Sequence, residues 1–455
     1  MCQPFADFFT EAASVLKSRV VDIQVGGPVL CWPITVGFQK GSVGSYTWYM
    51  WTKPLLDTAV PAGVLDFLDF HAYGQETNSV IHDMMLANAY TLSRFGVSLP
   101  TAVTETSYEL SEGENGTYNN RTAHLQRRTL LVLRDLLAYA AQPDKAKIRQ
   151  EHDLGAMAGG AYKFNNDPAT PEMQLYRALK PLRGKRMEAI LHQNAGIEQD
   201  VLTEVVHNRD IGSLVLVAAN FENHEIKLAL QIENLQAWMA TMPLPVSTAT
   251  WQVRVFDTTS LRPVAPPIAV DSIMLAPQSL TVITIPVNES RQASRSVRWR
   301  EYVSPAVMEL APHTASQVTF TTTINVSNVS AAPTNTVDGV GARLRVGMKG
   351  DAVRCDSWGL SVGGSAPFNW VPPATFRAGG CPPTSDPKYV NCTEHLQAGE
   401  TNVWGEVPIP EAVWTPRIGV LELELKSCLM TFARSPWPQP ILTFVSLLVL
   451  EDSHY

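Results

Sequence analysis

The amino-acid sequence predicts a mixed fold, α/β followed by all-β, in which part of an eight-stranded α/β barrel precedes two β-sandwich domains. Helical and strand-like hydrophobic patterns alternate as far as Leu182, and short strands separated by turn residues dominate after it. With 455 residues, the chain is also too long for a single core. We therefore expect three domains, which span residues 1–184, 185–296 and 297–455.

The first domain alternates between helices and strands. Apolar residues at helical spacing begin at Phe5, and Gly96 is a typical residue to end the helix before it. The expected helices span Phe5–Lys17, Trp48–Thr58, Asn78–Phe95, Thr122–Ala141 and Pro171–Leu182. The expected strands span Val20–Val25, Val64–Tyr73, Leu99–Glu105 and Leu154–Phe164.

Four strands that are each followed by a helix imply a parallel sheet with helical cover. Four is half the strand number of a (β/α)8 TIM barrel, so these strands would be strands five to eight. A small open α/β sheet is the alternative, and it would be complete as it stands. We favour the partial barrel because chemically distinctive residues gather at the carboxyl ends of the strands, where barrels build their sites.

The two later domains have the spacing of β-sandwiches, with strands separated by turn residues. In the second domain the expected strands are Leu214–Asn220, Ile226–Ile232, Trp251–Phe256 and Ser279–Val287. In the third they are Gln317–Val326, Ala342–Met348, Gly359–Val362, Val413–Ser427 and Ile441–Leu450. The third domain is the more similar to a jelly roll.

Composition excludes two classes of partner. The formal net charge is −8, which argues against a nucleic-acid partner, and we interpret the basic stretch Arg291–Arg300 as a solvated linker. No apolar run reaches the roughly 18 to 20 residues that a membrane helix needs. We expect no cofactor and no metal, because the six cysteines lack metal-ligand spacing.

Six N-glycosylation sequons favour a secreted protein, since this modification happens only in the secretory route. They lie at Asn115, Asn120, Asn288, Asn325, Asn328 and Asn391. Four of the six cysteines fall between Cys355 and Cys428, so one or two disulfides are plausible there, with buried thiols of an intracellular protein as the alternative. The N-terminus shows an amphipathic helix rather than a signal peptide, from which we expect that the true beginning is absent.

Three successive strand ends carry the candidate chemistry. The first ends in Gly26-Gly27-Pro28, the second in His71-Ala72-Tyr73, and the third in Thr104-Glu105-Thr106. A carboxylate such as that of Glu105 at a strand end can attack a sugar's anomeric carbon. An imidazole and a phenol, such as those of His71 and Tyr73, can hold sugar hydroxyls and orient the carboxylate. A loop carboxylate without function is the plainer interpretation of Glu105.

Three tryptophans lie in one loop region after the first strand end, namely Trp32, Trp48 and Trp51. Their rings are candidates for stacking on sugar rings, and a place in the hydrophobic core is an equally good interpretation.

The ordered motifs VGGPVLCWP, LDFLDFHAYG and TAVTETSYE resemble the second half of the barrel in retaining clan A glycoside hydrolases. They are most similar to the β-agarase and β-porphyranase group, glycoside hydrolase family 86. The later segments LVLVAANFENHEIKLAL and GLSVGGSAPFNW are also similar to that family. The resemblance implies a secreted endo-acting hydrolase of an agar-type galactan, with Glu105 as nucleophile, His71 and Tyr73 in its surroundings and Trp32 near the polysaccharide substrate. We expect the protein to be a monomer, and we keep Trp48 and Trp51 as candidate substrate-binding residues because of their place in the same loop region.

The resemblance also implies a general acid/base Glu in an Asn-Glu pair at the end of strand four. The opening residues Met1–Pro4 contain no such pair, so we expect this group to be absent from the chain. Two other functions remain open. One is a non-catalytic carbohydrate-binding protein derived from such an enzyme, and the other is a structural or adhesion protein that uses only its β-sandwiches.

Overall fold

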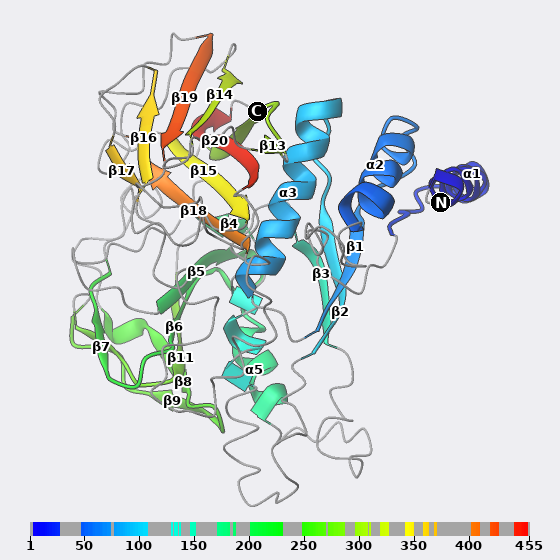
Figure 1. Ribbon diagram of the computed structural model, residues 1–455. Helices are drawn as coiled ribbons and strands as arrows, with labels where there is room; N and C mark the ends of the chain where they lie inside the picture. Colours follow the sequence, from blue (N-terminus) through cyan, green and yellow to red (C-terminus); the bar gives the residue numbers. More distant parts are fainter. Residues whose placement is uncertain are drawn as a thin grey trace, which may run out of the picture. The chain divides into compact units, whose positions relative to one another are not determined.

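The computed structural model of the chain combines helices with mostly antiparallel sheets (Figure 1). It describes residues 3–27, 47–73, 77–107, 129–130, 132–134, 136–137, 146–151, 171–182, 185–187, 201–230, 248–269, 272–286, 296–307, 309–310, 319–326, 342–349, 358–363, 368–370, 402–409, 419–426 and 441–453. The chain divides into two compact units, neither of which is continuous in sequence. The first comprises Met1–Glu105, Asp144–Gln150 and Arg295–Tyr455, and the second comprises Thr106–Pro143 and Glu151–Ser294.

The first unit begins with the predicted α/β pattern. Its helices are α1 (Gln3–Arg19), the π-helix η2 (Thr47–Thr52) that runs into α2 (Lys53–Ala59), and α3 (Thr77–Phe95). The predicted ends of these helices are confirmed to within a few residues. Gly96 has a φ of 69° and donates its amide to the carbonyl of Leu92, so it ends α3 as the sequence predicted.

Strands β1 (Leu68–Tyr73), β2 (Thr101–Ser107) and β3 (Ala146–Glu151) form one sheet in that order (Figure 1). One expectation needs correction here, and one strand was not predicted. The segment Val20–Val25 is not a strand, because it contains a turn in which Asp22 has a φ of 63°. The next residue, Gly26, forms a single parallel bridge to Phe67. The third strand of the sheet is β3, which precedes the predicted Leu154–Phe164, a segment outside the described residues. Its polar sequence AKIRQE lacks the apolar run by which strands were identified.

Two antiparallel sheets make up the rest of the described part of the first unit. One has the order β12-β20-β15-β18, with β13 also paired to β20, and the other has the order β14-β19-β16-β17. Their bounds are β12 (Ser296–Val303), β13 (Glu309–Leu310), β14 (Thr319–Asn325), β15 (Ala342–Lys349), β16 (Trp358–Val362), β17 (Phe368–Trp370), β18 (Asn402–Pro408), β19 (Val420–Lys426) and β20 (Ile441–Ser453).

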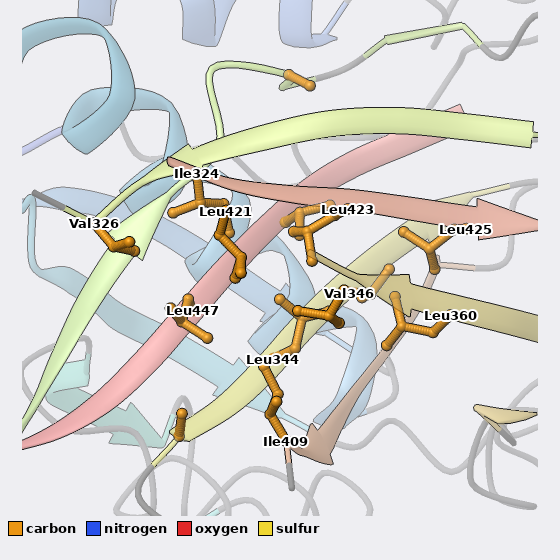
Figure 2. Close-up of a cluster of buried hydrophobic side chains, with 14 of the residues drawn as sticks. Ile324, Val326, Leu344, Val346, Leu360, Ile409, Leu421, Leu423, Leu425 and Leu447 are labelled. Carbon is orange, nitrogen blue, oxygen red and sulfur yellow. The ribbon is translucent and has the colours of Figure 1, made fainter. Parts of the chain in front are cut away.

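One hydrophobic cluster joins the facing sides of these two sheets (Figure 2). Along β14 and β19 buried and open positions alternate, as the two-residue period of a strand requires when one face is covered. The cluster draws on both sheets and includes Ile324, Leu421, Leu423, Leu425, Leu344, Val346 and Leu447. The strand β12 also corrects the interpretation of the basic stretch at residues 291–300, because Ser296–Val303 pairs with β20 rather than forming a linker.

The second unit is built on a six-stranded antiparallel sheet of order β4-β5-β6-β11-β8-β9, with β10 and β7 as a separate pair. The bounds are β4 (Lys185–Met187), β5 (Val201–Asn208), β6 (Ser213–Asn220), β7 (Ile226–Leu228), β8 (Gln252–Phe256), β9 (Leu261–Val264), β10 (Ile273–Leu275) and β11 (Ser279–Pro286), with short 3-10 turns η3 (Arg209–Ile211) and η4 (Thr248–Thr250). Every residue of β6 is buried, which means that the sheet is covered on both faces.

Helices cover one of these faces. The described residues between Thr129 and Leu137 are helical, and α5 spans Pro171–Leu179. Leu133, Leu137 and Leu175 share a core cluster with Val215 and Phe256 of the sheet. The other face packs on β7 and β10 through a second cluster that includes Leu216, Ile226 and Ile273. The domain boundary predicted at residue 184 stays a prediction. The helices before this residue share a hydrophobic core with strands that follow it.

Leu423→Ala should lower the free energy of unfolding of the first unit by about 2 to 5 kcal/mol, because it opens a cavity in a core where Leu423 is 1% exposed. Denaturant unfolding followed by tryptophan fluorescence measures the loss. Val420→Ala on the same strand is the matched control; that side chain is 51% exposed, so its loss should stay within about 0.5 kcal/mol. Equal losses for the two variants would contradict the assignment of this core.

Candidate active site

The candidate site depends on β1 and β2 running side by side in the same direction. The amide of Leu68, the first residue of β1, donates to the carbonyl of Pro100, which directly precedes β2, at 2.9 Å. Because the two strands begin beside each other, they are parallel neighbours, and their carboxyl ends lie at the same edge of the sheet. His71 and Tyr73 lie in the second half of β1, and Glu105 lies near the end of β2.

The Gly26-Gly27 segment joins the same sheet through an isolated bridge at Gly26. Its bridge to Phe67 is parallel, and the amide of Gly27 donates to the carbonyl of Phe67 at 3.3 Å. A Cβ on Gly26 would lie 2.0 Å from a ring carbon of Phe67, and Gly27 has a φ of 134°. Both positions therefore require glycine, the first because of close packing and the second because of its backbone conformation.

Asp66 fixes this segment to the sheet. One oxygen of its carboxylate accepts a hydrogen bond from the backbone amide of Val25 at 2.6 Å, and the other forms an ion pair with Lys17 Nζ at 2.7 Å. The backbone amide of Asp66 donates in turn to the carbonyl of Val25 at 2.8 Å. The carboxylate of Asp66, a residue two positions before β1, thus connects this part of the chain to the end of α1 and to the segment that leads to Gly26. Asp66 was not among the residues predicted from the sequence; the signal that marks it is a charged residue within the apolar run VLDFLDF.

Trp48 lies in the core rather than on a binding surface. Its side chain is 2% exposed and meets the ring of Tyr90 edge to face, with centroids 5.2 Å apart. The expectation that it stacks on a sugar does not fit this burial, because the ring offers no open face. The equally weighted interpretation, a place in the core, is the one that its burial supports.

Tyr90 connects α2 to α3. Its hydroxyl donates to Asp57 Oδ1 at 2.6 Å, and Lys53 pairs with the same carboxylate. Burial and then the hydrogen bond to Asp57 raise the pKa of Tyr90, against the opposing effect of Lys53. Burial lowers the pKa of Lys53, but its hydrogen bonds to Asp57 and Tyr90 outweigh burial, so this pKa is raised as well. The three groups hold the two helices together at neutral pH.

Of the other two tryptophans predicted to stack on sugar rings, Trp51 is 43% exposed. The centroid of its ring lies 5.7 Å from that of Phe5 on α1. It therefore has a partly open face. Trp32 lies outside the described residues. For His71, Tyr73 and Glu105 the structure describes the backbone only, so their roles in a site stay predictions.

In the described part of the chain, no group of three His, Cys, Asp or Glu residues is arranged to hold a metal ion. None of the helices described is long and apolar enough to cross a membrane.

Comparisons with known proteins identify the fold. Neither protein-family models nor the sequences of curated proteins matched this chain. Among solved structures, BuGH86 in complex with neoagarooctaose matches with a TM-score of 0.67 at 14% identity, over 99% of this chain and 67% of that one. A β-porphyranase of glycoside hydrolase family 86 from the human gut bacterium Bacteroides plebeius matches with a TM-score of 0.65 at 14% identity, over 98% of this chain and 74% of that one. The predicted resemblance to family 86 is thus confirmed for the fold.

Gly26→Ala should lower the free energy of unfolding by about 1 to 3 kcal/mol, because the new methyl group overlaps the ring of Phe67. In a double-mutant cycle, adding Gly26→Ala to Phe67→Ala should cost much less, since the obstructing ring is gone. Gly419→Ala, where a Cβ meets nothing within 4 Å, controls for a general effect of replacing glycine. An unchanged unfolding midpoint for Gly26→Ala alone would show that the segment does not pack on Phe67.

Proposed function

We propose that the chain is a retaining endo-glycoside hydrolase of an agar-type galactan, with Glu105 as its nucleophile. The observation that supports this proposal most strongly is the order of the strand ends. His71-Ala72-Tyr73 and Thr104-Glu105-Thr106 belong to the neighbouring strands β1 and β2, and Gly26-Gly27 lies beside the start of β1 through an isolated parallel bridge, within a fold shared with family 86 structures. One of those structures is named a β-porphyranase and another holds neoagarooctaose, which suggests galactans as the substrate class.

In the proposed reaction the Glu105 carboxylate attacks the anomeric carbon, and the bond to the leaving oxygen breaks. This step forms a covalent glycosyl ester, which water then hydrolyses with net retention at the anomeric centre. His71 and Tyr73, from the neighbouring strand, orient the carboxylate and hold sugar hydroxyls, while Trp32 and Trp51 contact the sugar chain. No cofactor takes part in this chemistry.

Retaining hydrolysis also needs a second carboxyl group, about 5 to 5.5 Å from the first, to protonate the leaving oxygen. We assign no residue of this chain to that role. Loss of such a group slows reaction by about a hundred- to ten-thousandfold, and the effect is smallest for leaving groups that need no proton. Activated aryl glycosides therefore report on Glu105 independently of the acid.

A carbohydrate-binding protein without catalysis is the second candidate. It is favoured by the partly open ring of Trp51, which offers a surface for stacking on a sugar. In either case we propose that the protein is a monomer and that it is secreted. The six sequons, which are sites for modification in the secretory route, support secretion.

Glu105→Gln should abolish labelling by a 2-fluoro-galactosyl fluoride and slow dinitrophenol release from dinitrophenyl β-galactoside by about a thousandfold or more, because an amide is a poor nucleophile. Mass spectrometry of the labelled wild-type peptide locates the ester. Glu11→Gln, at an exposed carboxylate of α1, is the matched control and should behave as wild type.

Retention on an agarose column separates the two candidate functions. The hydrolase is labelled at Glu105 and is retained by the column, and Glu105→Gln is retained equally well. A binding protein is retained but never labelled. A wild-type protein that is labelled at another residue would remove Glu105 from the mechanism, and one that is neither labelled nor retained would exclude both functions.

A further inference from the structure

Helix α3 connects β1 to β2 and has no solvent-exposed side through most of its length. Every residue from Ile81 to Thr91 is buried. These residues include polar side chains, among them His82 at 0% exposure and Asn88 at 1%. Burial of polar groups is costly unless each finds a hydrogen-bond partner, so the partners of these two side chains show what α3 packs against.

Both partners lie in the C-terminal part of the chain. Asn88 Nδ2 donates to Glu301 Oε2 on β12 at 3.0 Å, and His82 Nε2 lies 2.8 Å from the hydroxyl of Thr443 on β20. The ring of His82 also packs beside Phe444, with centroids 5.5 Å apart. Helix α3 contacts strands β12, β18 and β20 of the same sheet, and Figure 1 shows it lying along that sheet.

The contact at Asn88 continues directly to β2. Glu301 can only accept hydrogen bonds, so the amide of Asn88 must point its nitrogen toward that carboxylate. Its oxygen is then free to accept the hydroxyl of Ser98, at 2.9 Å. Ser98 lies three residues before β2, next to the Leu99-Pro100 segment whose carbonyl receives the Leu68 amide of β1. The path therefore runs from Glu301 through Asn88 to the start of the strand that carries Glu105.

The Glu301 carboxylate is itself held in place. Ser446 on β20 donates to its other oxygen, Oε1, at 2.7 Å, and Arg345 Nη1 on β15 lies 4.0 Å from the same oxygen. Arg345 also pairs with Glu406 on β18. Four strands of the C-terminal sheet thus contribute to fixing the carboxylate whose other oxygen, Oε2, meets α3. Buried polar groups that are paired in this way favour one arrangement of the strands that carry them.

We propose that Glu301 and Asn88 are positioning residues of the candidate active site, through which the C-terminal sheet sets the placement of β2 and hence of Glu105. This inference rests on the proposed function for the role of Glu105, but not for the placement of β2. It makes the C-terminal sheet a part of the site's scaffold rather than an appended domain. A shift of about 1 Å at a reacting group can cost about a hundredfold in rate, so such a contact matters to chemistry.

The test exchanges the two polar groups across the contact. Asn88→Asp places a carboxylate against Glu301, and the two repel each other. Adding Glu301→Gln restores one donor and one acceptor: the new amide nitrogen donates to the carboxylate at position 88, and the new amide oxygen accepts from Ser446. The carboxylate at position 88 still accepts from Ser98. The exchanged pair therefore keeps all three hydrogen bonds with their directions adjusted.

Two measurements are made on each variant of the full chain. Hydrogen exchange of the amides of Thr101–Ser107 reports on the placement of β2 without requiring any activity. The rate of labelling by the 2-fluoro-galactosyl fluoride, resolved into its limiting rate and half-saturating concentration, reports on Glu105. Asn88→Asp should raise exchange in β2 by about tenfold and lower the limiting labelling rate by about tenfold, with little change in half-saturation. The double variant Asn88→Asp with Glu301→Gln should restore both.

Two further variants keep the test decisive. Ser98→Ala removes only the last link, at an exposed residue, so it should fold and give a smaller change of the same kind even if Asn88→Asp does not fold. Leu423→Ala weakens the same unit away from the path. It should raise exchange across the whole unit and leave the limiting labelling rate of the folded protein unchanged.

The inference is overturned if exchange in β2 stays at the wild-type level in both Asn88→Asp and Ser98→Ala. It is also overturned if the exchanged pair fails to restore exchange that Asn88→Asp has raised. If exchange in β2 responds as expected while the wild-type protein takes no label, the placement of β2 stands and the proposed function fails. The two ideas are therefore separable by measurement.

Discussion

Burial of α3 on all sides is the constraint on which the first unit depends. A helix that covers a sheet in a soluble protein usually keeps one polar face in water, and α3 has none from Ile81 to Thr91. Its polar residues must then be paired inside the protein, and the pairs with Glu301 and Thr443 commit the helix to one sheet of the C-terminal region. This is the physical reason why segments more than 200 positions apart form one compact unit.

A second set of contacts fixes the other end of the α/β sheet. The carboxylate of Asp66 links α1 to the Val25 segment, and the close approach of Gly26 to Phe67 leaves no room for a side chain. These contacts explain why a segment with only one bridge residue still lies in a defined place beside β1. They also give the Gly26-Gly27 pair a structural reason that does not depend on any role in binding.

The second unit follows the same rule in a simpler way. Its six-stranded sheet has apolar residues on both faces, so it needs cover on both. The helical residues between Thr129 and Leu137 and α5 cover one face, and β7 and β10 cover the other. Helices that the alternating sequence pattern assigns to a barrel therefore contribute their apolar side chains to the core of this sheet. The fold shared with family 86 structures extends over both units, since the match covers 99% of the chain.

The sequence by itself determined the local structure wherever one strong period was present. Amphipathic spacing predicted α1 and α3, Gly96 predicted the end of α3, and apolar runs predicted β1, β2, β6, β11 and β20. The ordered motifs also pointed to the family whose fold the chain shares. Prediction from sequence failed where the pattern was weak or fitted two interpretations equally well. Strand β3 is polar, and Val20–Val25 has the composition of a strand but contains a turn. For Trp48, the core and a binding surface were equally good interpretations. Only the tertiary structure decided these cases, because burial depends on segments distant in the chain. It also decided that Asn88 donates a hydrogen bond to Glu301. These residues lie 213 positions apart in the sequence, so no local pattern can indicate the pairing.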